Sequence, residues 1–167
     1  MHSLAKTIVA SVLGLVALAG STQASGFAFE RVFIGKSIAK GEFSAINGVR
    51  RQFDVDLTGR WNGRVFTLRE DFTFSDGERD TKTWRFTKTS PTTYEGIRED
   101  VVGKTLVKID GRTARFTYLV YLDKQKTNKV RFHDTMILQA DGTVKNTAFV
   151  TKFGFPVAIT RVNFSRR

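Results

Sequence analysis

FTLREDFTFSDG, residues 66–77, combines a strand-like alternation with a turn. Every second residue from Phe66 to Phe74 is apolar except Glu70, and the residues between them are polar. Because side chains of a β-strand point alternately to opposite faces, this pattern predicts a strand with one buried face and one solvent face. Asp76-Gly77 then supplies the dipeptide of a tight hairpin turn. The stretch therefore predicts a strand that reverses, with Glu70 at a position where an apolar side chain is expected.

The same combination recurs along the chain. Further hairpin dipeptides stand at Asn47-Gly48, Asn62-Gly63, Asp110-Gly111 and Asp141-Gly142. The arms between the turns are rich in Val, Ile, Phe and Thr, and no segment after residue 24 has convincing helical periodicity. We therefore expect about ten strands. They lie near residues 35–46, 50–61, 64–75, 79–89, 93–99, 102–109, 112–123, 128–139, 144–153 and 157–165.

Strands joined in sequence by tight turns form an antiparallel up-and-down meander. A long open meander has two unpaired edges, and closing it into a barrel removes both. The sequence therefore predicts an all-β fold in which the meander closes into a lipocalin- or calycin-like barrel, with a half-open barrel or sandwich as the second possibility. An outer-membrane barrel is not expected, because outward positions such as Asp54, Asp56 and Arg60 would meet lipid.

The N-terminal segment resembles a targeting signal rather than part of a fold. It has a positive residue, a short apolar run and a cleavage site of small residues that ends at Ala24. Residues 1–24 are therefore predicted to be a cleaved secretory signal. Residues 25–167 then form a single domain. Ser21 occupies the position at which a bacterial lipobox would carry its lipidated cysteine. We therefore expect a soluble, exported, periplasmic protein.

Composition excludes several kinds of site. The chain has no cysteine, so disulfides, thiolate metal sites and thiol nucleophiles cannot form. Of the two histidines, only His133 lies after the predicted signal, which argues against a histidine zinc site. No metal and no cofactor are predicted.

The charge is strongly positive and unevenly distributed. There are 27 Lys and Arg residues against 16 Asp and Glu residues, and most of the excess follows residue 100. Such asymmetry favours an anionic partner, and after export an anionic membrane surface is more accessible than nucleic acid, which we do not expect as a partner. A solvated basic surface that aids solubility is the alternative. The candidate contacts are Lys124, Lys126, Lys129 and Arg131.

Turn lengths predict where Glu70 lies. A two-residue loop at Asn62-Gly63 pairs Glu70 with Val55, and a three-residue loop beginning at Asp76 pairs it with Trp84. Both pairings place the Glu70 side chain in the barrel interior.

Asp134 is a second carboxylate at a position where an apolar side chain is expected, within the alternating row of residues 130–138. An isolated ionised carboxylate in a dry core costs several kcal/mol, so it either becomes protonated or finds a partner. Candidate partners are Asn146, Lys152 and Arg161.

The turn at Asp141 decides which of these partners are available. A three-residue loop places Asn146 and Lys152 on the same face as Asp134, whereas a two-residue loop places Phe149 and Phe153 there. The sequence leaves both registers open.

Three interpretations of Glu70 and Asp134 follow. They form internal salt bridges or hydrogen bonds, they are the polar part of a ligand cavity, or they are a general acid–base pair. No nucleophile or metal supports catalysis, so no catalytic residue is assigned. The leading hypothesis is a barrel that binds a lipid-like amphiphile at the cell envelope. The alternatives are an envelope interaction module with a solid core and, third, a lipid-modifying enzyme. Candidate interior ligand-binding residues are Glu70, Asp134, Trp84, Trp61, Asn146 and Lys152.

These motifs resemble a bacterial family of exported proteins, domain of unknown function 3833, over residues 33–165. Many members of that family look like lipoproteins, from which this chain departs at Ser21. It also departs at His133 and Thr135, where the family pattern has an acidic and an aromatic residue. The resemblance implies no established activity, although relatives encoded near cyclopropane-fatty-acid synthase-like genes imply a connection with membrane lipid modification or oxidative stress. The matching motifs lie in residues 53–61, 68–78, 84–103, 132–138 and 146–155.

Overall fold

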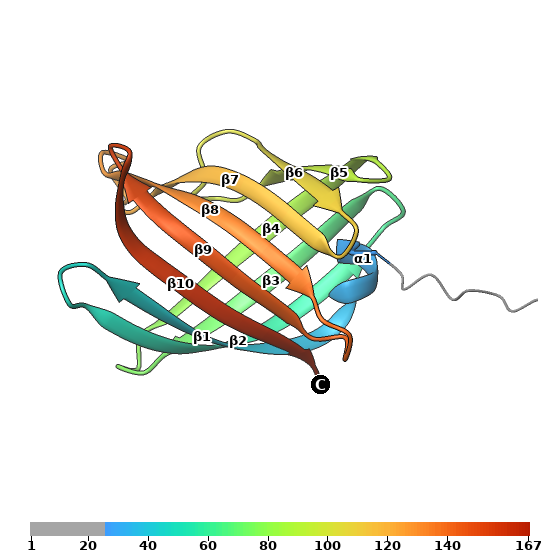
Figure 1. Ribbon diagram of the computed structural model, residues 1–167, viewed down its shortest axis with the longest axis horizontal. Coiled ribbons are helices and arrows are strands. Elements are labelled where there is room, and N and C mark those ends of the chain that lie inside the picture. The colour runs from blue at the N-terminus through green and yellow to red at the C-terminus, as the bar shows by residue number, and fades with distance from the viewer. Residues whose placement is uncertain (1–25) are drawn as a thin grey trace, which may run out of the picture.

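The structure, a computed structural model, describes residues 26–167 and contains ten β-strands and one short helix there. The predicted signal, residues 1–24, lies outside the described residues. Figure 1 shows the strands wrapping around a common axis. The elements are α1 (Phe29–Val32), β1 (Gly35–Ala45), β2 (Arg50–Trp61), β3 (Val65–Phe74), β4 (Arg79–Ser90), β5 (Thr93–Ile97), β6 (Thr105–Asp110), β7 (Thr113–Tyr121), β8 (Lys129–Leu138), β9 (Val144–Lys152) and β10 (Phe155–Arg166).

The sheet is a closed antiparallel meander. Each strand pairs with its neighbours in sequence, and β1 pairs with β10 to close the barrel. The predicted fold class and the approximate strand positions are confirmed. Closure leaves the sheet without free outer edge strands, which is the reason a long meander of this kind rolls up.

The register around Glu70 differs from the prediction. Glu70 lies opposite Leu57 rather than Val55 on β2, and opposite Lys82 rather than Trp84 on β4. Both errors are shifts of two residues. Because side chains alternate with a period of two, such a shift keeps every side chain on its predicted face. Glu70 therefore still faces the barrel interior.

A longer turn explains the shift between β2 and β3. Trp61 pairs with Phe66, so four residues rather than two lie between the paired positions. The Asn62 side-chain oxygen accepts hydrogen bonds from the N–H groups of Arg64 and Val65, at 3.0 and 2.7 Å. This local bonding, typical of asparagine in turns, replaces the predicted two-residue hairpin.

The side-chain faces of β8 and β9, which the sequence left open, match the three-residue alternative, although the register is shifted by two residues because Leu138 pairs with Val144. Asp134 lies opposite Ala148, and Asn146 lies opposite Met136. Asn146 and Lys152 therefore share the inward-facing row with Asp134, whereas Phe149 lies on the outer face, where its side chain is exposed.

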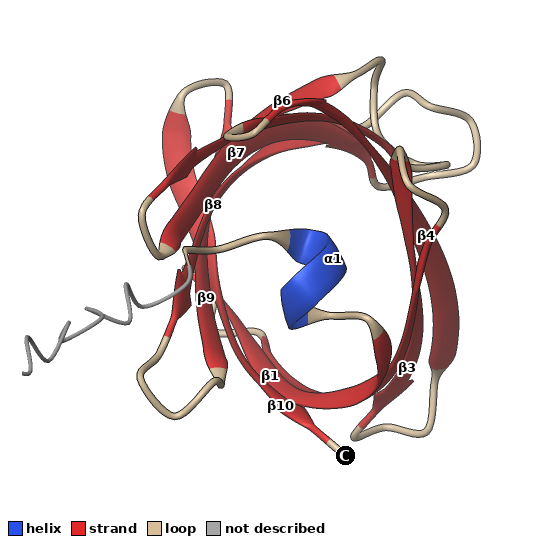
Figure 2. Cartoon of the chain, turned by 90° about the vertical axis from the view of Figure 1, so that its right-hand side faces the viewer, coloured by secondary structure: helices blue, strands red, loops and turns tan. Residues whose placement is uncertain are grey.

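The helix α1 was not predicted, because a single turn is too short to produce a periodic pattern. It lies inside the ring of strands at one end of the barrel (Figure 2). The Phe29 ring stacks on Phe86 with centroids 4.2 Å apart, and the Tyr94 ring meets it edge-on at 5.2 Å. The Glu30 carboxylate accepts hydrogen bonds from Lys88 Nζ at 2.5 Å and from the Tyr94 hydroxyl at 2.7 Å. These contacts make α1 a plug that closes this end of the barrel.

One glycine is required where the chain leaves α1. A Cβ atom added to Gly59 on β2 would lie 1.8 Å from the carbonyl oxygen of Phe33. Only glycine allows the backbone after the plug to approach the barrel wall this closely.

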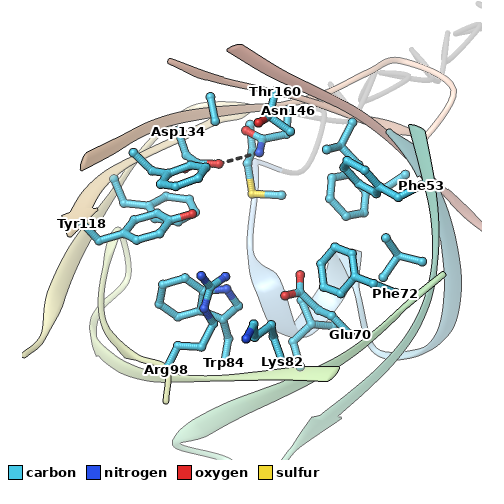
Figure 3. Close-up of a pocket in the computed structure, with 18 of the residues that line it drawn as sticks. Phe53, Glu70, Phe72, Lys82, Trp84, Arg98, Tyr118, Asp134, Asn146 and Thr160 are labelled. Atoms are coloured by element: carbon cyan, nitrogen blue, oxygen red, sulfur yellow. Dashed lines mark hydrogen bonds between the residues drawn. The ribbon is translucent and has the colours of Figure 1, made fainter. Parts of the chain in front are cut away.

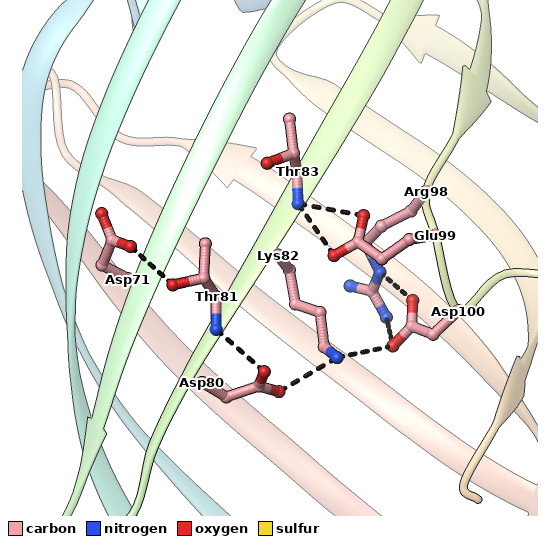
Figure 4. A network of polar contacts seen from close by, with 8 residues as sticks. All are labelled: Asp71, Asp80, Thr81, Lys82, Thr83, Arg98, Glu99 and Asp100. Atoms are coloured by element: carbon pink, nitrogen blue, oxygen red, sulfur yellow. Dashed lines mark hydrogen bonds and ion pairs between the residues drawn. The ribbon is translucent and has the colours of Figure 1, made fainter. Parts of the chain in front are cut away.

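The loop of residues 98–104, between the short strands β5 and β6, fills a gap in the barrel wall. The Thr83 N–H on β4 donates to the Glu99 carboxylate at 3.2 Å (Figure 4). On the other side, the Tyr121 N–H on β7 donates to the Asp100 carbonyl at 2.8 Å, and Val101 forms a bridge with Val120. The loop therefore satisfies backbone groups of β4 and β7 in place of a strand.

Residues 26–167 include no helix whose length and apolar character would let it cross a bilayer.

Candidate functional site

A cavity of about 220 Å³ lies inside the barrel. Its floor includes Phe29 and Phe86, each only 1% exposed. Toward the end opposite α1, its walls include Phe72, Phe74 and Phe132, which are only partly buried. The cavity is therefore closed by the plug and opens at the opposite end, and most of its surface is aromatic or aliphatic (Figure 3).

Glu70 projects into this cavity from β3. Among the described residues, no hydrogen bond or ion pair to its carboxylate is present. Burial in the apolar interior raises the pKa of Glu70 to about 7, although the positive charge of Arg98 opposes this change and the negative charge of Asp134 adds to it. Near neutral pH the group exists in both protonation states, and its oxygens face the cavity.

Asp134 and Asn146 form a second polar group on another part of the wall. Asn146 Nδ2 donates to Asp134 Oδ1 at 2.5 Å, and both residues are buried. Asp134 Oδ2 and Asn146 Oδ1 are also buried, and neither has a hydrogen-bond partner among the described residues. A buried acceptor without a donor costs roughly 1–3 kcal/mol. The wall therefore contains two buried acceptor oxygens with unused capacity.

The acidity of Asp134 reflects the same surroundings. Burial raises its pKa to about 6, while the hydrogen bond from the Asn146 amide and the charge of Arg98 limit the increase by favouring the ionised form. Asp134 and Glu70 thus face one cavity with pKa values near neutrality.

Two cations lie beside the cavity, and both are already paired. Arg98 Nε donates to Asp100 at 2.6 Å, and its guanidinium lies 4.7 Å from the centre of the Trp84 ring. Lys82 Nζ lies 3.0 Å from Asp80 and 3.4 Å from Asp100 (Figure 4). These carboxylates offset the charges of the two cations but do not use all their N–H groups, so the cavity wall offers some donors as well as oxygen acceptors.

The sequence analysis missed both cations. Lys82 belongs to the inward row that contains Trp84 and Phe86, so its alternation with them was a usable signal. Arg98 lies in a loop, where no periodicity indicates the direction of a side chain.

The other predicted interior residues lie in different places. Trp84 lines the cavity, whereas Trp61 lies near the plugged end, where it is partly buried against the core. Lys152 Nζ donates to Asn128 Oδ1 at 2.8 Å and so joins two loops at the open end. Arg161 lies on the outer face of β10, 3.6 Å from Glu42, so it is not a partner of Asp134.

The four basic residues predicted to contact an anionic surface are exposed. They lie in the loop between β7 and β8 and at the start of β8, at the open end of the barrel. They are Lys124, Lys126, Lys129 and Arg131.

The arrangement can accept hydrogen bonds inside an apolar space. Glu70, Asp134 and Asn146 offer oxygen atoms, and the surrounding rings offer faces to which a cation is attracted. Within residues 26–167, no group of three His, Asp or Glu side chains could hold a metal ion. The oxygen atoms of this site can therefore bind a hydrogen-bond donor, such as a hydroxyl or an ammonium group, that carries an apolar body.

Residues 16–166 match the family described as Protein of unknown function (DUF3833). This chain is a DUF3833 protein. No curated protein has a significant sequence match to it.

Two solved structures are similar to this DUF3833 protein. The S-type phycobiliprotein lyase CPES from Guillardia theta has a TM-score of 0.60 at 8% identity, over 83% of this chain and 90% of that chain. A de novo designed fluorescence-activating β-barrel has a TM-score of 0.45 at 11% identity, over 84% of this chain and 99% of that chain. At such identities the similarity to the lyase shows a shared calycin-like barrel and nothing about function.

Proposed function

We propose that this protein is an exported, periplasmic binding protein that holds a small amphiphilic, lipid-like molecule in its barrel. One observation carries the proposal: Glu70, Asp134 and Asn146 line one aromatic cavity, and the buried Asp134 Oδ2 and Asn146 Oδ1 atoms have no hydrogen-bond partner among the described residues. A ligand that donates hydrogen bonds to these oxygens would relieve the cost of burying them. Small closed barrels of this kind commonly enclose one small ligand.

The size of the cavity limits what can enter. Its volume of about 220 Å³ exceeds the roughly 150 Å³ of an apolar cavity that binds benzene, and lies below the roughly 300–1,000 Å³ of drug-sized sites. The cavity accommodates a short apolar segment together with one polar group. A longer amphiphile would place only part of itself inside.

The charges favour a particular polar group. The two cations beside the cavity are held by Asp80 and Asp100, while the carboxyl groups of Glu70 and Asp134 remain available. A ligand carboxylate would be repelled by Glu70 once Glu70 ionises, whereas an ammonium or hydroxyl group would donate to it. An amine or alcohol at the end of an alkyl chain is therefore the expected class.

A series of ligands matched in chain length tests this proposal. Decylamine, decanol and decanoate would be titrated at pH 8 into a Trp61→Phe variant, in which Trp84 in the cavity wall is the remaining tryptophan. We expect decylamine and decanol to change Trp84 fluorescence with saturation, and decanoate to bind more weakly. Absence of saturable binding by all three compounds would overturn the proposal.

Variants then locate the binding site. Glu70→Gln is expected to weaken decylamine binding by about 10-fold to 100-fold, the equivalent of one hydrogen bond to a charged group. Glu42→Gln, which changes an exposed carboxylate on the outer face of β1, is the matched control and should bind as the parent does. Equal weakening by both substitutions would place the ligand outside the cavity.

Acid–base catalysis on a bound amphiphile is the second candidate function, because two carboxyl groups with pKa values of about 7 and about 6 face the same cavity. It predicts turnover of a lipid substrate that Glu70→Gln and Asp134→Asn each abolish while the barrel stays folded. Turnover that survives both substitutions would exclude it.

A further inference from the structure

The open end of the barrel carries a cluster of exposed apolar and basic side chains. Phe153 is 90% exposed and Phe155 is 74% exposed, at the turn between β9 and β10, and Leu122 is 55% exposed beside the loop between β7 and β8. Single exposed apolar residues are ordinary, but a group of them surrounded by polar residues marks an interaction surface. We define the docking rim as Leu122, Lys124, Lys126, Lys129, Arg131, Phe153 and Phe155.

The two loops that form the docking rim are neighbours in space. The Lys152 ammonium before one turn donates to Asn128 Oδ1 in the other loop at 2.8 Å, and Arg131 pairs with Thr151 in the sheet. Lys129, Arg131 and Phe153 also line one depression on the outer surface. Figure 1 shows both loops at the end of the barrel opposite α1.

The positive charge of the docking rim is not neutralised by nearby acids. No ion pair within residues 26–167 involves Lys124, Lys126, Lys129 or Arg131. The acid in this loop, Asp123, instead accepts hydrogen bonds from the N–H groups of Thr127 and Asn128, at 3.0 and 2.6 Å. Asp123 therefore shapes the loop, and the four cations remain available to an external anion.

The backbone conformation of two residues in the docking-rim loops, Lys126 and Phe153, supports a specific role for them. Lys126 and Phe153 have φ angles of 61° and 51°, and no other non-glycine residue in the described chain has a positive φ. The turn of Phe153-Gly154 has two consecutive positive φ values, for which Asn-Gly is the usual sequence. A phenylalanine at such a position is sterically disfavoured, and residues in this conformation cluster at functional sites. Here the strain accompanies an outward-facing apolar ring and an outward-facing cation.

We infer that the docking rim binds the surface of an anionic phospholipid bilayer, so that the mouth of the barrel faces the membrane. Lysine and arginine side chains are attracted to anionic headgroups, and phenylalanine and leucine side chains enter the boundary between headgroups and acyl chains. The docking rim therefore has cations for the anionic headgroups and exposed apolar side chains for the boundary beneath them. A nucleic acid would engage the cations but would not require the aliphatic tip at Leu122.

The cavity and the docking rim share structural elements. β8 carries Arg131 on its outer face and Phe132 and Asp134 on its inner face, where they line the cavity. Docking therefore brings the cavity mouth to the bilayer. Binding to a bilayer does not require an occupied cavity, so this inference can fail or succeed independently of the proposed function.

Vesicle co-sedimentation tests the inference. Residues 25–167 would be mixed with vesicles of phosphatidylcholine containing phosphatidylglycerol, and with vesicles of phosphatidylcholine alone. We expect binding to the anionic vesicles that weakens as salt is added, and little binding to the neutral ones. Phe153→Ser with Phe155→Ser, and separately Lys124→Glu with Lys126→Glu, should each weaken binding at least about tenfold.

The opposite end of the barrel offers matched controls. Ile137 and Lys145 lie opposite each other on the outer faces of β8 and β9, and Ile137 is 43% exposed. Ile137→Ser, and Lys145→Glu with Lys108→Glu, should bind anionic vesicles within about twofold of the parent. Circular dichroism checks that each variant is folded, and Glu70→Gln should dock normally because it alters only the cavity.

Three outcomes would overturn the inference. These are equal binding to neutral and anionic vesicles, equal losses in the rim variants and the controls, or tight binding of a DNA duplex that competes with vesicles and ignores the Phe153 and Phe155 substitutions. The last result would assign the basic residues to nucleic acid.

Discussion

Replacing Glu70 with glutamine removes an ionisable group that folding transfers from water into the barrel. The pKa of this carboxyl rises from 4.5 to about 7, chiefly because burial disfavours the charged form. Each pKa unit corresponds to about 1.4 kcal/mol, so ionised Glu70 lowers the free energy of unfolding by about 3 kcal/mol.

The sign follows from proton binding. Between about pH 4.5 and pH 7 the folded protein holds the Glu70 proton while the unfolded chain releases it. Raising the pH through this window therefore destabilises the folded state, and the loss is complete above about pH 7.5. Glutamine has no proton to lose. Glu70→Gln should match the parent near pH 4.5 and be more stable than it by about 3 kcal/mol at pH 8.

Urea denaturation followed by tryptophan fluorescence at a series of pH values from 4.5 to 8 measures this difference. Comparing the variant with the parent at each pH cancels the titration of all other groups. Glu42→Gln on the outer face of β1 is the control, and its difference from the parent should stay within about 0.5 kcal/mol throughout. A Glu70→Gln difference that does not change with pH would refute the reasoning, because it would mean that folding leaves the Glu70 carboxyl hydrated.

Three further substitutions test other parts of the structure by the same measurement. Asp134→Asn should add about 3 kcal/mol at pH 8 and little at pH 4, because burial raises the pKa of Asp134 from 3.8 to about 6; a loss of stability at pH 8 would contradict this. Gly59→Ala should remove more than about 2 kcal/mol, since its Cβ would meet the Phe33 carbonyl, and an unchanged urea midpoint would argue against the described plug. Glu30→Gln should remove about 1–2 kcal/mol at pH 7. Although burial opposes the change, hydrogen bonds from Lys88 and Tyr94 lower the pKa of Glu30, so its contribution is lost as the pH falls below 4.5, and an equal effect at pH 3 would contradict this.

Most of the fold could be predicted because the chain repeats one simple signal. Alternation and turn dipeptides located the ten strands, and closure followed from the need to pair the edges. Register was harder, since the turn after Trp61 depends on which backbone groups the Asn62 side chain binds. The helix α1 gave no signal, because its stability comes from contacts with distant residues such as Phe86 and Tyr94.

The candidate site was predictable only where it interrupts a regular pattern. Glu70 and Asp134 stood out as carboxylates in apolar rows, and the structure brings both to one cavity. Arg98 could not be found in this way, because its position depends on the fold of a loop that fills the gap between β4 and β7. Neither the volume of the cavity nor the unpaired oxygen of Asn146 can be read from a pattern of alternation, since both depend on how side chains of different sizes meet across the barrel.

The plug α1 makes the barrel a cup rather than a tube. A molecule held inside must arrive and depart along one path, so loading and unloading compete for the same opening and cannot occur together. Any tail too long for the cup must project back through that opening, and the loops around the opening would then contact the tail.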